Sequence, residues 1–301
     1  MSAKKESMTD HQLHLAALQG DLNKLRLILD SGKVHVDCKD KDGTTPLILA
    51  AANDHLECVK ELINEGADPN ERRTTGTTAL FFAAQGGFLE IVKELIEQGA
   101  QIDLPSEDGG TPLFVACQCN HLDVVKELVA RGAEIHRTMT DGATPLFIAA
   151  QNGHYNMLKY LISQGAKVDQ TRKDKASPLW IAAQMGHSEI IKELLLSGAK
   201  VDEAREQDGA TPLFKAAHKG YTDCVNDLIM KGASLGLLQN GETALHAAAL
   251  FGHLKVVKQL IESGSDVTLK NKDNVTAAEM AKDAGFDVIA EFLTKSAASK
   301  S

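Results

Sequence analysis

The sequence predicts an all-α protein built from about nine stacked helix-turn-helix units, each joined to the next by a short β-hairpin tip. Three observations carry this prediction: an internal repeat of about 33 residues, a helix-starting phrase in each repeat, and an aromatic content of only 4% in 301 residues. Repeats of this length are single supersecondary units that bury their apolar faces only against their neighbours. We therefore expect a solenoid with a thin, continuous core and irregular terminal caps.

A recurring phrase sets the repeat. It begins at Thr44 as TTPLILAA, and its second residue, Thr45, recurs as Thr or Ser at 78, 111, 144, 177, 211 and 243, a spacing of 33 except for one step of 34 and one of 32. Weaker copies around His11 and from Val275 bring the number of units to nine, near residues 8–42, 43–75, 76–108, 109–141, 142–174, 175–208, 209–240, 241–273 and 274–295. We expect a single repeat domain over 8–295, a disordered N-terminal tail at 1–7 and a C-terminal tail at 296–301.

The first helix of each unit begins at this phrase. Thr144 is typical of a helix N-cap, because its hydroxyl can accept a hydrogen bond from a backbone amide, and Pro145 suits the first helical position. The alanine pair that follows, Ala149 and Ala150, allows close packing against neighbouring helices.

The second helix is indicated by an apolar stripe. In the unit containing DVVKELVARGA, the residues at helical spacing are Val124, Val125, Leu128 and Val129. Gly132 supplies the left-handed residue that ends a helix. A polar stretch then leads to an Asp-Gly pair, typical of a tight tip. Lys175 stands where other tips have Gly, so that tip must be strained or adopt another turn, and Asn274 replaces Gly in the last tip.

Together, the TPL phrase, the alanine pair, the Gly-His turn and the Gly-Ala stop in a 33-residue frame resemble ankyrin repeats over roughly residues 8–295. The resemblance implies a non-enzymatic solenoid that binds other proteins through its concave groove and hairpin tips. It also implies a weak candidate modification site, because LINEGADPN around Asn70 is similar to the consensus of asparaginyl hydroxylases that act on such repeats. His136 occupies the corresponding position in a histidine variant of that consensus.

Composition narrows the partners and the location. A net charge of −9 removes the bulk attraction that drives non-specific nucleic-acid binding. No apolar run is long enough to insert into a membrane. Five scattered cysteines do not resemble a disulfide framework, which favours the cytoplasm, with the nucleus as the open alternative. We expect a monomer.

The sequence lacks the motifs typical of catalytic and metal sites. His187 and Glu189 match half of a zinc-deaminase signature, but its CxxC partner never occurs. Cys117, Cys119 and His121 could in principle hold zinc, yet a one-residue gap on a helix points two thiols apart, so small buried cysteines are the favoured interpretation. The sequence therefore predicts no catalytic, cofactor or metal site.

Two slots of the first helix repeat along the chain. Rings occupy one slot in five successive units, and we favour a core role over an exposed stripe: Phe81, Phe114, Phe147, Trp180 and Phe214. Four residues later, on the same helical face, lies a position that is polar in successive units. Its side chains could form hydrogen bonds with the backbone of an extended peptide. The alternative is a neutral residue that was copied by duplication of the repeat. The candidate partner-binding residues of this region are Gln85, Gln118, Gln151, Gln184 and His218, with Met185 and Lys215 beside them.

Histidines and basic residues also repeat. We interpret His55, His121, His154, His187 and His253, which start the second helices, as architectural. Basic residues cluster at the middle tips, where they are either solvated loop charge or arginine forks for an acidic or phosphorylated partner segment. The tip candidates are Arg72, Arg73, Arg137, Arg172, Lys173 and Arg205.

The function predicted from these observations is a non-enzymatic scaffold that binds one or more proteins. The alternative is a structural, elastic spacer without a dedicated ligand.

Overall fold

The computed structural model describes residues 7–239 and 241–298, and the chain divides into two compact units, 1–140 and 141–301. Every regular element among the described residues is a helix, which confirms the all-α prediction. The predicted hairpin tips are turns without paired strands. The β pairing found in the described part is one isolated bridge between Lys270 and Thr276. The predicted N-terminal tail lies outside the described residues except for Ser7, which caps α1.

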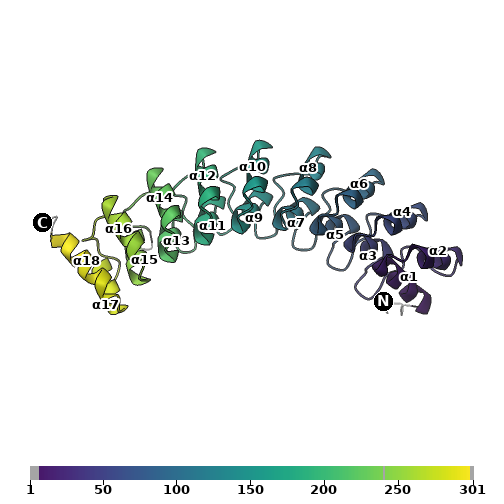
Figure 1. Cartoon of the computed structure of the whole chain (residues 1–301), viewed down its shortest axis with the longest axis horizontal. Helices are drawn as coiled ribbons and strands as arrows, with labels where there is room; N and C mark the ends of the chain where they lie inside the picture. Colours follow the sequence, from purple (N-terminus) through teal and green to yellow (C-terminus); the bar gives the residue numbers. More distant parts are fainter. Residues whose placement is uncertain (1–6, 240, 299–301) are drawn as a thin grey trace. The chain divides into compact units, whose positions relative to one another are not determined.

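The N-terminal unit contains four helix pairs, shown in purple to blue in Figure 1. We call the odd-numbered helix of each pair the first helix and the even-numbered one the second helix. First helices pack on first helices and second on second, as in α3 with α5 and α4 with α6. The elements are α1 (Met8–Gln19), α2 (Leu22–Asp30), α3 (Pro46–Ala52), α4 (Leu56–Asn64), α5 (Ala79–Gly86), α6 (Leu89–Glu97), α7 (Pro112–Gln118) and α8 (Leu122–Ala130).

The C-terminal unit repeats this arrangement with five pairs. Its helices are α9 (Pro145–Asn152), α10 (Tyr155–Ser163), α11 (Pro178–Met185), α12 (Ser188–Leu196), α13 (Pro212–Lys219), α14 (Thr222–Met230), α15 (Ala244–Leu250), α16 (Leu254–Glu262), α17 (Ala277–Asp283) and α18 (Asp287–Ala298). The last helix continues three residues beyond the predicted end of the repeat domain at 295. Whether the chain behaves as a single domain stays a prediction.

The helix starts follow the predicted chemistry. The Thr144 hydroxyl accepts from the Phe147 amide at 3.1 Å, and the same cap recurs at Thr45, Thr78, Thr111, Ser177, Thr211 and Thr243. The second helix α2 is capped by Asp21, whereas α4, α6, α8, α10, α12, α14 and α16 have no side-chain cap. These second helices bury one apolar stripe, for example Val124, Val125 and Leu128 on α8. Local sequence thus fixes where helices begin, and neighbouring repeats hold them.

The repeated histidines connect adjacent repeats, which confirms their architectural role at four of the five positions. His121 Nε2 is 3.0 Å from the carbonyl oxygen of Gln85, one repeat earlier. The imidazole lies against Gly87, where any side chain would collide with the ring. Equivalent bonds join His55 to Leu18, His187 to Gln151 and His253 to His218.

The aromatic slot is a core slot. Phe114, Phe147, Trp180 and Phe214 are buried, and Trp180 Nε1 donates to the Ala210 carbonyl at 2.9 Å in the next repeat. Phe81 differs, because it is only partly buried. The core interpretation is confirmed for four rings, and the fifth lines an open hollow described below.

Lys175 takes the left-handed conformation that glycine adopts at other tips. Its φ is 65°, compared with 75° at Gly43, 78° at Gly76 and 90° at Gly142. Its amide still donates to the Arg172 carbonyl at 3.0 Å, so the tip keeps its turn and accepts the backbone strain. Asn274, at φ 62°, does the same with a residue that tolerates this region better.

Replacing Lys175 with Gly should raise the free energy of unfolding by about 1 kcal/mol, because left-handed backbone costs an L-residue roughly that much. Urea unfolding of the whole chain measures the change. The control is Lys173→Gly in the same tip, where φ is not positive and the substitution should bring no gain. Equal stability of Lys175→Gly and the unmodified chain would show that the tip stores no strain.

Candidate partner-binding surface

The predicted glutamine slot lies on the first helices but falls in both units. Gln85 on α5 and Gln118 on α7 are exposed, whereas Gln151 on α9 and Gln184 on α11 are half-buried. The structure therefore places two of these glutamines together in the N-terminal unit and two in the C-terminal unit, and each group is described by itself.

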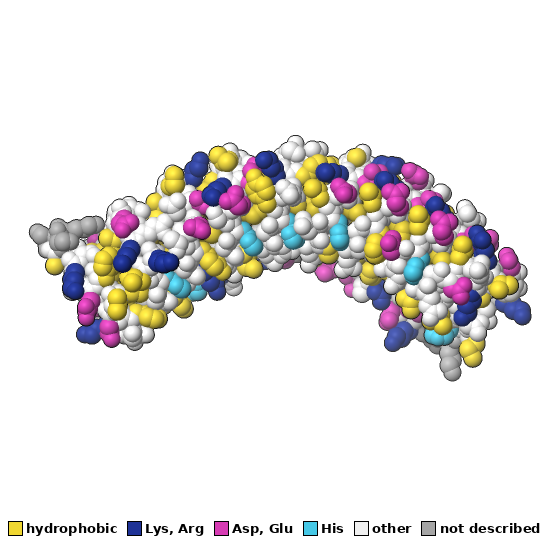
Figure 2. All heavy atoms as spheres, in the orientation of Figure 1, with side chains coloured by type: hydrophobic (Ala, Val, Ile, Leu, Met, Phe, Trp, Pro, Cys, Tyr) yellow, Lys and Arg dark blue, Asp and Glu magenta, His cyan; other side chains and the backbone are white. Residues whose placement is uncertain are grey.

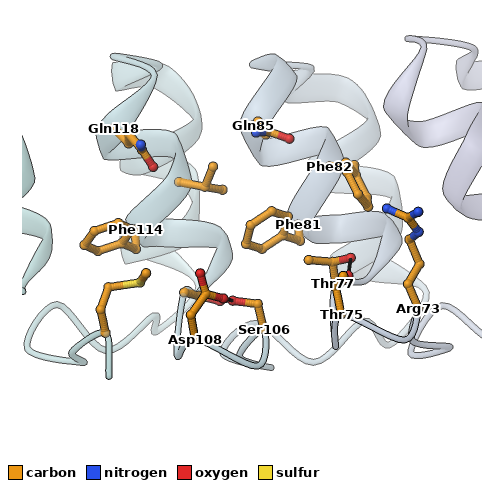
Figure 3. Close-up of a pocket in the computed structure, with 13 residues that line it drawn as sticks. Arg73, Thr75, Thr77, Phe81, Phe82, Gln85, Ser106, Asp108, Phe114 and Gln118 are labelled. Carbon is orange, nitrogen blue, oxygen red and sulfur yellow. Dashed lines mark hydrogen bonds between the residues drawn. The ribbon is translucent and has the colours of Figure 1, made fainter. Parts of the chain in front are cut away.

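In the N-terminal unit, the two glutamines border a hollow of about 340 Å³ between α5, α7 and the tips (Figure 3). Phe81 and Phe114 lie below the glutamines, on the same side of the two helices. The full lining is Arg73, Thr75, Thr77, Phe81, Phe82, Gln85, Ser106, Asp108, Gly110, Phe114, Val115, Gln118 and Met139. We call this hollow the Phe81 groove. Rings below and polar groups at the rim are a typical lining of a binding pocket.

Gly110 helps to keep the Phe81 groove open. A Cβ atom at this position would lie 3.0 Å from Ser106 Oγ and 3.3 Å from Met139 Sδ, closer than side chains normally approach. The equivalent position carries alanine in three later repeats, at Ala143, Ala176 and Ala210, and each of these is buried. Sequence reasoning missed this residue, although a single glycine in that column of the repeat was visible.

The polar rim of the Phe81 groove has a cation at one end. Arg73 Nε donates to Thr44 Oγ1 at 3.0 Å, and its guanidinium lies over the Phe82 ring, 5.6 Å from the centroid. In the next tip, Ser106 Oγ donates to Asp108 Oδ1 at 3.0 Å. The groove therefore carries charges of both signs, with Arg73 at one end and Asp108 in the tip below Phe81 and Phe114 (Figure 3).

The C-terminal unit uses its tip arginines differently. Arg172 binds Asp174 through two hydrogen bonds of 3.2 and 2.7 Å, and its guanidinium lies over Phe147 at 5.2 Å. Arg205 repeats the arrangement with Asp208, at 3.2 and 2.7 Å, and lies over Trp180 at 4.6 Å. These two forks are already occupied by carboxylates of their own chain.

The ion pairs form a connected row, because Lys215 Nζ also donates to Asp208 at 2.8 Å. Burial opposes ionisation of Asp208, but hydrogen bonds from Arg205 and Lys215 outweigh it and lower its pKa to about 2. The bond from Arg172 likewise lowers the pKa of Asp174. Sequence reasoning counted the basic residues here and missed their acidic partners two or three positions away.

The remaining tip candidates are dispersed. Arg72 donates to the backbone carbonyls of Gly76 and Pro105, and Arg137 forms an ion pair of 3.7 Å with Glu134. Lys173 is exposed. On the face shown in Figure 2, positive and negative side chains are interspersed rather than gathered by sign. A partner role for these residues stays a prediction.

The other candidates of the C-terminal unit form a second, more apolar region. His218 lies between Phe214 and Phe251, with ring centroids 6.4 and 4.1 Å away. Burial and then the nearby Lys215, Lys219 and His253 lower the pKa of His218. Its Nδ1 and Gln184 Oε1 are buried without a hydrogen-bond partner among the described residues. Met185 and Phe251 are each 46% exposed.

Asn70, the predicted modification site, joins two repeats. Its side-chain oxygen accepts from the Gln101 amide at 2.7 Å, and its nitrogen donates to the Gly99 carbonyl at 3.1 Å. Asp103 accepts from the Glu134 amide in the following repeat, so this slot has a structural role. His136 is exposed. Hydroxylation of either residue stays a prediction.

The cysteine cluster is separated by burial. Cys117 is fully buried, which raises the pKa of its thiol, whereas Cys119 is exposed and His121 is engaged with Gln85. Within residues 7–239 and 241–298, no group of three or more His, Cys, Asp or Glu side chains could hold a metal ion. None of the described helices combines the length and apolarity needed to span a bilayer.

This arrangement of capped first helices, striped second helices and glycine-stopped tips is that of ankyrin repeats, and the chain belongs to that family. A family model described as ankyrin repeats, three copies, matches residues 13–106, 49–139, 132–205 and 179–271.

Two curated relatives extend the likeness. Ankyrin repeat domain-containing protein 29 of Danio rerio is 51% identical over 73 residues, and its human counterpart is 49% identical over 73 residues. The match spans 24% of this chain and 24% of each relative, about a quarter of their length. A resemblance to this protein is also predicted by the phrases TTALFFAAQGG and SPLWIAAQMGHSE, and the match confirms it. The crystal structure of the human ASB11 ankyrin repeat domain is 31% identical, with a TM-score of 0.67 over 73% of this chain and 98% of that one.

Replacing Asp208 with Asn should destabilise the chain at pH 7 by about 1 kcal/mol, after allowance for solvent screening of a partly exposed pair. The pKa of Asp208 is lowered by folding, so its contribution is present above pH ~4 and is lost as the pH falls toward the folded value of about 2. Thermal unfolding from pH 7 to 2 should therefore show the two proteins converging in acid.

The matched control is Glu206→Gln, which removes the same charge from an exposed side chain in the same tip. It should change stability by less than about 0.5 kcal/mol. A difference between wild type and Asp208→Asn that is constant with pH would contradict the assignment.

Proposed function

We propose that this chain is a non-enzymatic scaffold whose partner binds the face formed by the first helices and the tips, in the concave groove of the repeats. Ankyrin repeats are generally protein-interaction modules without catalytic activity. The single observation that carries the proposal is the Phe81 groove, an open hollow with partly buried rings and exposed amides.

The chemistry of the Phe81 groove supports a peptide or protein segment as ligand. Gln85 and Gln118 each present an amide that can both donate to and accept from a backbone, and the partly buried Phe81 offers apolar surface beneath them. Aromatic and arginine side chains are the usual energetic anchors of interfaces, and both occur here in Arg73, Phe81 and Phe82.

The C-terminal unit supplies a second candidate region of the same kind. Gln151, Gln184, Met185 and His218 are its proposed contacts, and exposed Met185 and Phe251 supply apolar surface for them. Lys215, Arg172 and Arg205 support this region by holding the tips through ion pairs. Their role is thus in the fold more than in direct recognition.

We also propose a monomer in the cytoplasm. All five cysteines are free, as suits a reducing compartment. The spacer alternative offers no reason for an open hollow with exposed amides, so the scaffold is the better-supported proposal.

Affinity capture from cell extract should separate the two ideas. The variant Gln85→Glu with Gln118→Glu adds two charges at the rim of the Phe81 groove without touching the core, and it should lose most of the recovered partner. Quantitative mass spectrometry of the captured proteins measures the loss.

The control variant adds the same two charges elsewhere, at exposed Gln101 and Gln164. It should recover the partner like wild type. Equal recovery by both double variants would remove the Phe81 groove from the proposal, and the absence of any specific partner would favour the spacer.

A further inference from the structure

We propose that the Phe81 groove binds an extended partner segment that carries one aspartate or glutamate beside a bulky apolar side chain, with Arg73 as the carboxylate receptor. This inference rests on the proposed function and specifies the chemistry of its partner.

Arg73 occupies the same structural slot as Arg172 and Arg205. In each case the arginine amide donates to the carbonyl of the residue before the helix N-cap, at 3.0 Å for Arg73 to Thr77, 3.0 Å for Arg172 to Ala176 and 3.1 Å for Arg205 to Ala210. The guanidinium of Arg172 lies over Phe147, and that of Arg205 over Trp180, both on the first helix that precedes the tip. The ring slot before Arg73 holds Ile48, and its guanidinium lies instead over Phe82, on the first helix that follows the tip. The three arginines therefore share a backbone position, although the Arg73 guanidinium rests on a different ring.

The tip that contains Arg73 lacks the carboxylate that pairs with the arginine in the later tips. Arg172 is paired bidentately with Asp174, two residues later in the tip, but the corresponding residue after Arg73 is Thr75. The Thr75 hydroxyl is engaged with that of Thr77 at 2.8 Å. Among the described residues, Arg73 has the single side-chain hydrogen bond to Thr44 and forms no ion pair. Its two terminal nitrogens are thus available to a carboxylate from outside.

The Arg73 guanidinium is held in place. The bond from Nε to Thr44 and the Phe82 ring fix its plane, and the residue is half-buried at the rim of the groove. Phe82 is itself distinctive, because the same helix position carries Val115, Ile148 and Ile181 in the next three repeats. A fixed, partly desolvated fork binds a carboxylate more strongly than a free surface arginine does.

The apolar lining of the Phe81 groove indicates which side chain should accompany the carboxylate of the partner segment. Phe81 and Phe114 line the groove beyond Phe82 as seen from the cation (Figure 3), and Gly110 leaves room near them for an apolar side chain. Asp108, in the tip below Phe81 and Phe114, would repel a second acid. Charge complementarity thus favours one carboxylate at the Arg73 end followed by an apolar residue, rather than a run of acids.

The test is selection of a random twelve-residue peptide display library on the full chain, followed by fluorescence anisotropy with the selected peptides. The informative variant is Thr75→Asp, which installs the carboxylate that pairs with Arg172 in the later tip. Thr75→Asn is the matched uncharged control. Gly110→Thr, the residue found at Thr44 and Thr77, narrows the groove itself, and thermal unfolding checks that each variant folds.

Selected peptides should be enriched in Asp or Glu adjacent to Leu, Phe or Met. Thr75→Asp should weaken their binding by roughly tenfold or more, the loss of one charge-assisted contact. Thr75→Asn should change it by less than about twofold, a few tenths of a kcal/mol. Replacing the peptide acid by its amide should remove the difference between the two variants.

Two results would overturn the inference in distinguishable ways. In the first, Gly110→Thr weakens peptide binding, but Thr75→Asp and Thr75→Asn have the same effect as each other. This result would refute acid recognition and leave the Phe81 groove as a binding site. Peptides unaffected by Gly110→Thr and by both Thr75 variants, or no selected peptide at all, would count against the groove and its proposed function together.

Discussion

Burial between neighbouring repeats is the constraint on which the rest of the structure depends. A single pair of short helices cannot cover its own apolar face, so Leu80, Ala83 and Ala84 on α5 are fully buried because α3 and α7 pack on either side. Small alanine side chains bring these helices together. The surface that faces away from this stack is free of the packing requirement, which is why residues such as Gln85 and Gln118 can vary in chemistry without loss of the fold.

The sequence could predict what local chemistry decides. The caps at Thr144 and Ser177, the stripes of the second helices and the rings in the core follow from residue type and spacing alone. The candidate site was less predictable, because it depends on side-chain geometry inside the tips. From the sequence alone, Arg172 and Arg205 are predicted to be available cations, but the structure pairs each with a carboxylate. Gly110 contributes to the groove because it has no side chain to fill it.

A difference of one residue between two tips changes the electrostatic surroundings of an arginine. With Asp174 two residues away, Arg172 becomes part of a structural row of charges on the rings of the core. With Thr75 at the equivalent place, Arg73 lies over Phe82 of the following helix and lacks an ion pair within the described chain. The repeat frame supplies identical backbone positions, so single substitutions are enough to give neighbouring tips different electrostatic behaviour.

Where a first helix is followed by a glycine, the contact between that glycine and a ring of the following repeat gives the stack a direction. A side chain at Gly153 would lie 2.8 Å from His187, and one at Gly252 would collide with Phe286. The fit is thus shared between the end of one first helix and the start of the next repeat's second helix. Asp54 and Asn120 take the place of this glycine at two other junctions. Recombination that moves whole repeats would therefore have to match the residue at the end of one first helix to the ring downstream, so the unit of exchange is a junction rather than a repeat.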